Sequence, residues 1–297
     1  MKMKCVSCDG RIVFSNPDFC KTHFIDYFEK KVTETIKKFK LITEDDLRKG
    51  ICAGVSGGKD SLTVLYILSK YFGNATALAI DEGISGYRER TLEWLKKFCN
   101  KNKINYKIIQ FRDEFGTTLD ELLKRKKINP CTACGIFRRY LLNKHSKNYS
   151  AIATGHNLDD ECQSIIMNFL SYNPFMLSKL GPISGMSRNS KFTKRIKPLY
   201  FCTEKEVLAY SILQGFEADY NECPYSTHSF RADVRDFLNE TESRFPGTKK
   251  KIINNALNII EQIGKKSGNA NICRRCSEPS SKEICNACLL AEKLKGM

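Results

Sequence analysis

The sequence lacks long apolar runs, both in its interior and directly after its N-terminus. No stretch of its 297 residues approaches the roughly 18 consecutive apolar residues that a membrane-spanning helix needs. The first five residues, Met1-Lys-Met-Lys-Cys5, contain no apolar segment of the kind found in secretory signals. The sequence therefore predicts a protein without membrane contact, and the cytoplasm is its default location.

Acidic residues are scarce as well. The chain has 33 Asp and Glu against 49 Lys and Arg, which gives a formal net charge of +16. This excess favours an acidic partner, most plausibly nucleic acid, over a merely solvated basic surface. The 297 residues are enough for one large domain or two smaller ones, and the 41% of hydrophobic residues make a sizeable core available.

Fourteen cysteines are many for a protein of a reducing compartment, where they indicate metal binding or catalysis rather than disulfides. Two sets have the spacing of tetrahedral zinc sites. They are a Cys₃His set near the N-terminus, Cys5, Cys8, Cys20 and His23, and a Cys₄ set near the C-terminus, Cys273, Cys276, Cys285 and Cys288. Few apolar residues lie within the first set, so a metal ion is expected to hold that segment together.

A third set consists of Cys131-Thr-Ala-Cys134 and the distant Cys223, which directly precedes Pro224. Three thiolates are able to hold an iron–sulfur cluster and leave one iron open. A redox disulfide, a persulfide on one of these cysteines and a purely structural role are the alternatives. Arg138 and Arg139 follow closely and can lower the pKa of a thiol or bind phosphate.

A glycine-rich stretch, Ala53-Gly-Val-Ser-Gly-Gly-Lys-Asp-Ser61, lies between an apolar run and a predicted helix. A strand, a glycine turn and a helix in this order form an anion site, because backbone N–H groups and the positive helix end face the same point. The stretch is not a Walker A motif, since position 53 is Ala and position 60 is Asp. Instead, SGGKDS resembles the PP-loop of ATP pyrophosphatases, which cleave ATP between the α and β phosphates.

Strand and helix patterns alternate through the middle of the chain, which predicts a doubly wound, parallel α/β sheet. The expected strands are 51–55, 75–81, 106–111 and 149–154, and the expected helices are 24–39, 43–49, 62–70, 86–102, 119–127, 136–147, 158–170, 204–214 and 228–264, the last broken near Pro246. Ligands of such sheets bind beyond the carboxyl ends of the strands, where Asp81 and Gly155-His156 join the glycine-rich loop.

Two further stretches carry charge of interest. Asp159-Asp160, behind the fourth strand, are able to hold Mg²⁺ through carboxylate oxygens or to complement a helix dipole. Residues 173–195 are predicted to form a long mobile loop. Its candidate phosphate contacts are Lys179, Arg188, Lys191, Lys194 and Arg195.

Taken together and in this order, the motifs resemble the TtuA-type family of tRNA 2-thiouridine synthetases, which includes the cytoplasmic tRNA 2-thiolation proteins. The resemblance covers nearly the whole chain and includes Asn-Pro-Cys-Thr-Ala-Cys-Gly, Ala-Thr-Gly-His-Asn-Leu-Asp-Asp-Glu and Glu-Cys-Pro-Tyr. It implies three units, namely a zinc finger at 1–25, a PP-loop domain at 26–245, and a helix with a second zinc finger at 246–297.

The resemblance also implies site residues. ATP is expected at Gly54, Val55, Ser56, Gly57, Gly58, Lys59, Asp60, Ser61, Asp81, Gly155 and His156. Catalytic roles are expected for Cys131, Cys134, Cys223, Lys59, Asp60, Arg138 and Asp160, with Arg139 an alternative cation to Arg138. The three cysteines would ligate a [4Fe–4S] cluster, and two zinc ions and Mg²⁺ complete the expected cofactors.

The implied reaction adenylates the C2 carbonyl oxygen of a tRNA uridine, at position 34 rather than 54, and then replaces it with sulfur. The sulfur donor is either a ubiquitin-like thiocarboxylate protein or sulfide, and a homodimer is expected. Cytidine 2-thiolation, lysidine formation and persulfide-based thiolation are alternatives among enzymes. From another class, a zinc-knuckle RNA-binding module with a degenerate ATP fold is the alternative.

Overall fold

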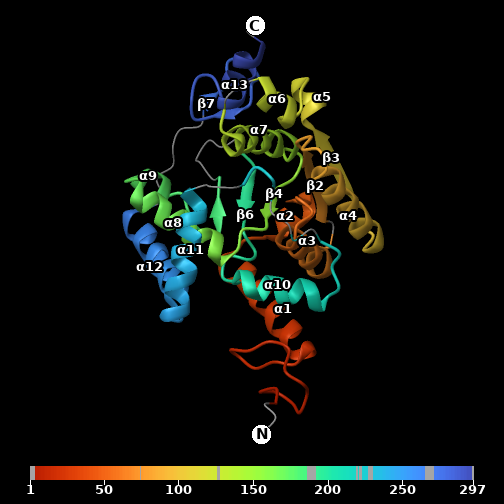
Figure 1. The fold of residues 1–297 in the computed structure, drawn as a ribbon, viewed down its shortest axis with the longest axis vertical. Coiled ribbons are helices and arrows are strands. Elements are labelled where there is room, and N and C mark those ends of the chain that lie inside the picture. The colour runs from red at the N-terminus through yellow and green to blue at the C-terminus, as the bar shows by residue number, and fades with distance from the viewer. Residues whose placement is uncertain are drawn as a thin grey trace.

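The computed structural model describes residues 4–73, 75–125, 128–185, 192–218, 220, 223–226, 230–264 and 271–295. Its central sheet has the strand order β3-β2-β1-β4-β6-β5 (Figure 1). The strands are β1 (Ile51–Gly54), β2 (Ala75–Asp81), β3 (Tyr106–Gln110), β4 (Ala151–Thr154), β5 (Ile183–Ser184) and β6 (Lys194–Ile196). All neighbours pair in parallel except β5, which runs antiparallel to β6 at the edge. The predicted α/β class is thus confirmed, with an antiparallel edge strand added.

Thirteen helices are assigned in the described part of the chain. They are α1 (Lys21–Lys38), α2 (Glu44–Lys49), α3 (Lys59–Phe72), α4 (Arg88–Lys101), α5 (Phe111–Phe115), α6 (Leu119–Arg125), α7 (Pro130–His145), α8 (Leu158–Leu170), α9 (Pro174–Leu177), α10 (Glu204–Leu213), α11 (Phe230–Arg244), α12 (Thr248–Ile263) and α13 (Asn286–Lys295). The short strands β7 (Asn271–Ile272) and β8 (Pro279–Ser280) form a small hairpin before α13.

Helices cover both faces of the sheet, as buried parallel strands require. Alternate strand residues point to opposite sides. Ala53 and Ala77 pack with α1, α3, α4 and α10 in one apolar cluster, whereas Cys52 and Leu78 pack with α5, α6 and α7 in another. A third cluster joins α8, α11 and α12. The glycine-rich loop is therefore held between two buried layers.

The helix that carries the third cysteine set begins earlier than predicted. α7 starts at Pro130 rather than at residue 136. The Oδ1 atom of Asn129 accepts a hydrogen bond of 2.9 Å from the Thr132 amide, and proline occupies the first turn, where it costs no hydrogen bond. Cys131 and Cys134 consequently lie within the first five residues of this helix.

The prediction of one long loop over 173–195 is wrong in part, because α9, β5 and β6 lie within it. Among its basic residues, Lys194 forms an ion pair with Asp46, and the Lys179 ammonium lies 3.9 Å from the centre of the Phe175 ring. Their charges are therefore engaged within the protein. Arg188 and Lys191 lie outside the described residues.

The ends of the chain are joined closely to the sheet domain. Phe24 and Phe28 of α1 are buried in the main core, directly behind His23. α12 packs on α8 through Ile253 and Ala256. The unit boundaries at 25 and 245 remain predictions. In the described ranges, no helix combines the length and the apolar character that crossing a membrane requires.

Candidate active site and metal centres

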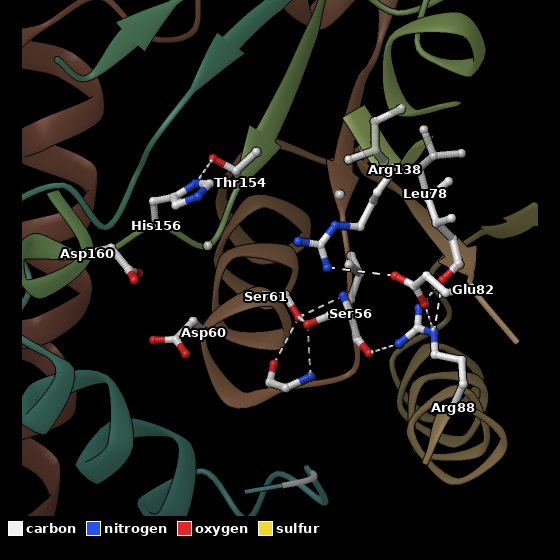
Figure 2. A pocket seen from close by; sticks show the side chains of 16 residues that line it. Ser56, Asp60, Ser61, Leu78, Glu82, Arg88, Arg138, Thr154, His156 and Asp160 are labelled. Atoms are coloured by element: carbon white, nitrogen blue, oxygen red, sulfur yellow. Dashed lines mark hydrogen bonds and ion pairs between the residues drawn. The ribbon is translucent and has the colours of Figure 1, made fainter. Parts of the chain in front are cut away.

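A cavity of about 390 Å³ opens at the carboxyl ends of β1, β2 and β4 (Figure 2). It brings together most of the predicted site residues, namely Gly54, Val55, Ser56, Gly58, Asp60, Ser61, Arg138, Gly155, His156 and Asp160. Glu82 and Arg88 also line it, and sequence reasoning missed both. Gly57, Lys59 and Asp81 are not among the lining residues.

The glycine-rich loop is shaped by hydroxyl groups and by a close backbone approach. The Ser56 amide donates a hydrogen bond of 3.2 Å to Oγ of Ser61, and that hydroxyl donates one of 2.9 Å to the Gly58 carbonyl. Gly57 has φ +91°, and a Cβ atom there would lie 2.4 Å from the carbonyl oxygen of Thr91. Only glycine fits at this position.

Gly155 closes the opposite side of the loop. A Cβ atom on it would lie 2.8 Å from the Ser61 amide nitrogen, at the first turn of α3. The β4 loop therefore lies directly against the helix end that would receive an anion.

Lys59 and Asp81 lie near the cavity but are occupied elsewhere. The Lys59 ammonium is 3.0 Å from Oδ2 of Asp60 and 3.2 Å from Oε1 of Glu204. Burial acts to lower the pKa of Lys59, but these two carboxylates raise it, so the lysine is charged. Asp81 accepts a hydrogen bond of 2.9 Å from the Gly83 amide and stabilises the turn after β2.

Two carboxylates, Asp60 and Asp160, face one another at the cavity mouth (Figure 2). Asn157 fixes both, since its Nδ2 donates to Oδ1 of Asp60 at 2.9 Å and its backbone amide donates to Oδ2 of Asp160 at 3.2 Å. Burial, followed by the charge of Asp60, raises the pKa of Asp160 to about 6. Two carboxylates held together by one asparagine are a suitable oxygen donor set for Mg²⁺.

His156 lies at the same mouth, and its Nδ1 is 2.9 Å from the Thr154 hydroxyl. Its ring is exposed, yet partial desolvation in the concave site and the positive charges of Lys197 and Arg231 lower its pKa to about 3. The ring is therefore neutral and offers one donor and one acceptor nitrogen.

Buried charges form the inner wall of the cavity. Nη1 of Arg88 donates a hydrogen bond of 2.5 Å to the Ser56 carbonyl, and its Nε lies 2.8 Å from Oε2 of Glu82. Arg138 approaches the other Glu82 oxygen at 3.7 Å (Figure 2). Arg88 thus braces the glycine-rich loop, and Glu82 joins that brace to α7.

The third cysteine set gathers beside Arg138. Burial raises the pKa of Cys134 to about 12, with Glu82, Cys223 and Cys131 acting in the same direction. Partial desolvation acts to lower the pKa of Arg138, but Cys134, Glu82 and Cys223 raise it. Cys131 donates to the Tyr225 carbonyl at 3.4 Å, two residues beyond Cys223. The three thiols, of which Cys131 is exposed and the other two are half-buried, therefore lie near one another with a cation beside them.

The spacing of these sulfurs differs from that of the terminal sets. Within the described residues, only the N- and C-terminal sets bring three or more ligand atoms within 4.8 Å of one another. Cys131, Cys134 and Cys223 are therefore not gathered as tightly as the two terminal sets.

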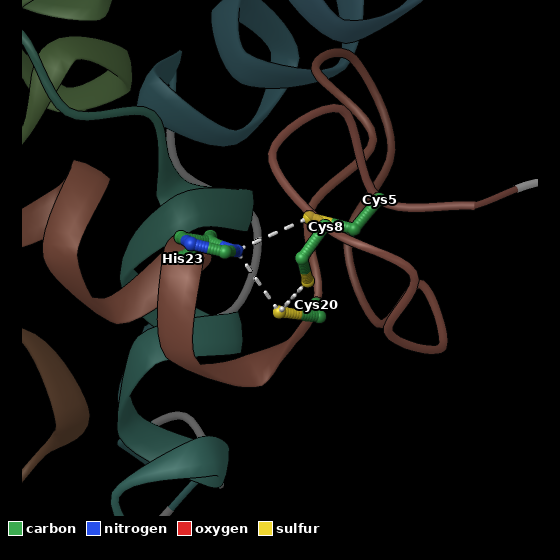
Figure 3. A group of neighbouring side chains, drawn as sticks. All are labelled: Cys5, Cys8, Cys20 and His23. Atoms are coloured by element: carbon green, nitrogen blue, oxygen red, sulfur yellow. Dashed lines mark hydrogen bonds between the residues drawn. The ribbon is translucent and has the colours of Figure 1, made fainter.

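The N-terminal set converges on one point (Figure 3). Nδ1 of His23 lies 3.4 Å from the sulfurs of both Cys5 and Cys20, and the sulfurs of Cys8 and Cys20 are 3.7 Å apart. Burial opposes ionisation of Cys5, but the amides of Cys20 and Ser7 lower its pKa to about 6. Such thiolate-favouring contacts are the outer support of a structural metal site.

The C-terminal set is similar. The sulfurs of Cys276 and Cys285 are 3.7 Å apart, and the Cys285 amide donates to the Cys273 sulfur at 3.2 Å. Burial acts against ionisation of Cys273, but backbone amides lower its pKa to about 6. Four sulfurs in this arrangement suit a tetrahedral zinc ion.

Comparison with known proteins identifies the protein family to which the chain belongs. A model of the PP-loop domain matches residues 28–242. A tRNA-5-methyluridine(54) 2-sulfurtransferase of Pyrococcus horikoshii is 38% identical, over 96% of this chain and 93% of its own. The cytoplasmic tRNA 2-thiolation protein 1 of Danio rerio is 31% identical, over 99% and 89%. The U34-tRNA thiolase NcsA of Methanococcus maripaludis, solved with its [4Fe-4S] cluster, superimposes with a TM-score of 0.81 at 33% identity, over 99% and 97%.

Proposed function

Because the chain belongs to the PP-loop family that includes the tRNA 2-thiolation proteins, we propose that it is a tRNA sulfurtransferase that replaces the C2 oxygen of a uridine with sulfur. The observation that carries the proposal is the position of α7. Arg138 of this helix lines the PP-loop cavity, and Cys134, one turn earlier, lies beside Cys223 and Cys131. One rigid helix thereby joins an anion site to a thiol site.

ATP is the proposed ligand of the cavity, whose volume of about 390 Å³ lies within the common range of ligand pockets, roughly 300–1,000 Å³. Its phosphates would rest on the amides of the loop and on the N-terminus of α3. Gly155 keeps a side chain away from the Ser61 amide at the start of α3, and Ser56 and Ser61 add hydroxyl groups. Arg138 supplies the positive charge that Lys59, paired with Asp60 and Glu204, does not direct into the cavity.

Asp60 and Asp160 would hold Mg²⁺, which neutralises phosphate charge when it is bound. Asn157 keeps both carboxylates in place. The terminal cysteine sets would each hold one zinc ion, and their amide-to-sulfur hydrogen bonds favour the thiolates that zinc requires.

Cys131, Cys134 and Cys223 would ligate the [4Fe–4S] cluster, which supplies an iron site with an open position for sulfur. Arg138 balances the negative charge of the thiolates. A persulfide on one of these cysteines remains the alternative.

The reaction proceeds in two balanced steps. The C2 oxygen of the uridine attacks the α phosphate of ATP and pyrophosphate leaves. A sulfur nucleophile then attacks C2, and the C–O bond breaks with AMP as the leaving group. The loop amides and Arg138 stabilise the charge that develops on the phosphates. The neutral His156 can orient the base or the ribose at the cavity mouth.

The test is in vitro thiolation of tRNA by anaerobically purified protein with ATP and sulfide, read by mass spectrometry of nucleosides. Cys131→Ala and Cys223→Ala proteins are expected to fold and to bind ATP but to make no 2-thiouridine. Cys99→Ala, which removes a buried thiol of α4 away from these cysteines, is the control. Wild-type activity in the first two variants would remove the cysteine set from the mechanism. ATP binding without tRNA-dependent release of pyrophosphate would favour a zinc-knuckle RNA-binding module.

We propose position 34 as the target, as in the U34-tRNA thiolase NcsA of Methanococcus maripaludis. Position 54 is the second candidate, because a relative of higher identity is described as acting there. Digestion of the product tRNA into anticodon and T-loop fragments distinguishes the two. The same proposal includes a cytoplasmic location, a homodimer, and sulfide or a ubiquitin-like thiocarboxylate protein as sulfur donor.

A further inference from the structure

A second cavity, of about 270 Å³, lies on another face of α7, between this helix and the C-terminal cysteine knuckle. Arg138 and Leu142 of α7 face the PP-loop cavity, whereas Arg139 and Asn143 face this one. α13 lies beside α7 at the end of the molecule that carries the C-terminus (Figure 1). The second cavity is therefore separated from the PP-loop cavity by a single helix.

Two guanidinium groups, those of Arg139 and Arg195, line this cavity. In the described part of the chain, neither has a carboxylate partner in an ion pair. Burial and the charge of Arg139 lower the pKa of Arg195, as expected for two cations held close together. Asn286 and Ala287, in the first turn of α13, also line the cavity and add the positive end of a ten-residue helix. Glu278 is the one carboxylate among the lining residues, and Lys147 neutralises it at 2.5 Å.

Two residues of the cavity lining carry buried acceptor atoms. Among the residues that the structure describes, Oδ1 of Asn143 and Oε2 of Glu278 have no hydrogen-bond partner, and both residues are only 6% exposed. A buried acceptor left unpaired destabilises the fold, because its desolvation is not compensated. The cavity therefore calls for a ligand that carries a negative charge and a hydroxyl donor a few ångströms apart.

A ribose-phosphate unit has this combination of groups, and the 2′-hydroxyl distinguishes RNA from DNA. We propose that the cavity binds one ribose-phosphate unit of the tRNA backbone. The phosphate would lie between Arg139 and Arg195 at the N-terminus of α13, and the 2′-hydroxyl would donate to Asn143. The proposal rests on tRNA being the substrate, and it assigns the C-terminal knuckle a role in holding RNA against α7.

The test is the affinity of the full-length protein for tRNA as a function of salt, measured by fluorescence anisotropy. Arg139→Ala and Arg195→Ala are each expected to weaken binding roughly tenfold and to reduce the slope of log K against log salt by about one phosphate contact. Arg244→Ala removes an exposed arginine of α11 and is the control that should change neither. Affinity for ATP should be unchanged in all three, which also verifies that they fold.

A second arm compares an RNA hairpin with the DNA hairpin of the same sequence. Asn143→Leu keeps the side-chain size but removes the acceptor for the 2′-hydroxyl, so the preference for RNA over DNA should shrink in this variant. Its ATP affinity and melting temperature report on its fold. Unchanged affinity and salt slope in both arginine variants would overturn the proposal. Binding of inorganic phosphate in the cavity without any loss of tRNA affinity would also overturn the proposal, because the cavity would then be a site for a free anion. Failure of the wild-type protein to bind tRNA would instead contradict the proposed function.

Discussion

Nη1 of Arg138 lies 3.7 Å from Oε1 of Glu82, at the boundary between the PP-loop cavity and the three thiols. Glu82 also contacts Arg88, which holds the Ser56 carbonyl of the loop. The charge of Arg138 is therefore positioned by the same carboxylate that is tied to the phosphate-binding loop. Its neighbour Arg139 lies on another face of the helix.

This difference predicts separate effects for two adjacent arginines. Arg138→Ala should lower the rate of thiolation at saturating tRNA by about 10²–10³-fold, the usual loss when one charge-stabilising donor is removed. Arg139→Ala should leave that rate nearly unchanged and raise the tRNA concentration needed to reach it. Single-turnover kinetics over a range of tRNA concentrations measures both. Equal rates for the two variants at saturation would contradict the assignment of Arg138.

A second prediction concerns the glycine-rich loop. Gly57→Ala places a methyl group 2.4 Å from a backbone carbonyl oxygen, which cannot move without displacing α4. We expect ATP binding to be lost. Gly116→Ala is the matched control, since Gly116 also has a positive φ but has open space around it. That variant should lose only about 1 kcal/mol of stability and keep its ATP affinity. Isothermal titration calorimetry with a non-hydrolysable ATP analogue measures the affinity of both variants. Normal binding by Gly57→Ala would show that the phosphates do not bind at the glycine-rich loop.

Local sequence patterns predicted the parts of the site that depend on local geometry. The glycine-rich loop and both terminal cysteine sets lie where their spacing placed them. Each is determined by contacts within a few residues, so a short pattern contains the information. The early start of α7 was also readable, because Asn129-Pro130 is a typical helix beginning.

Other features depend on contacts between distant segments. Glu82 directly follows β2 and Arg88 is the first residue of the charged helix α4, and only the fold places them together in the buried wall. The strands β5 and β6 are too short for a periodic signal, and pairing with β4 defines them. The division of α7 into faces toward two cavities requires the positions of β6 and the C-terminal knuckle.

A third prediction concerns pH and stability. Glu29 of α1 is 3% exposed and accepts hydrogen bonds from Lys70 at 2.7 Å, from Tyr210 at 2.6 Å and from Tyr71. Burial acts to raise its pKa, but these donors lower it below its usual value. The stabilisation is therefore complete above the pKa of the unfolded chain and is lost as pH falls through the lower folded pKa.

Glu29→Gln should consequently reduce the free energy of unfolding by about 2–3 kcal/mol at pH 7, and the difference from wild type should shrink in acid. Glu34→Gln, on the same helix but paired with Lys30 at 3.9 Å on the surface, should have little effect. Urea unfolding at pH 7 and at pH 4 measures both variants. If the loss of unfolding free energy in Glu29→Gln stayed constant or grew as the pH fell, the link between stability and the ionisation of Glu29 would be contradicted.

The last prediction concerns metal content. Protein purified without oxygen should contain about two zinc ions and about four irons per chain. Cys8→Ser and Cys276→Ser should each remove one zinc and leave the iron, because the two terminal sets do not share ligands. Cys134→Ser should remove the iron and its absorption and leave both zincs. Cys202→Ala, a buried thiol in the main core, is the control that should change neither metal.

Elemental analysis together with sulfide determination gives these counts directly. Zinc alone, even after anaerobic reconstitution with iron and sulfide, would favour a persulfide on Cys131, Cys134 or Cys223. That outcome would leave the ATP site and the tRNA substrate in place, because neither depends on iron. Loss of zinc together with iron in Cys134→Ser would instead show that the third set supports the fold, and the raised pKa of Cys134 would then reflect burial of a structural thiol.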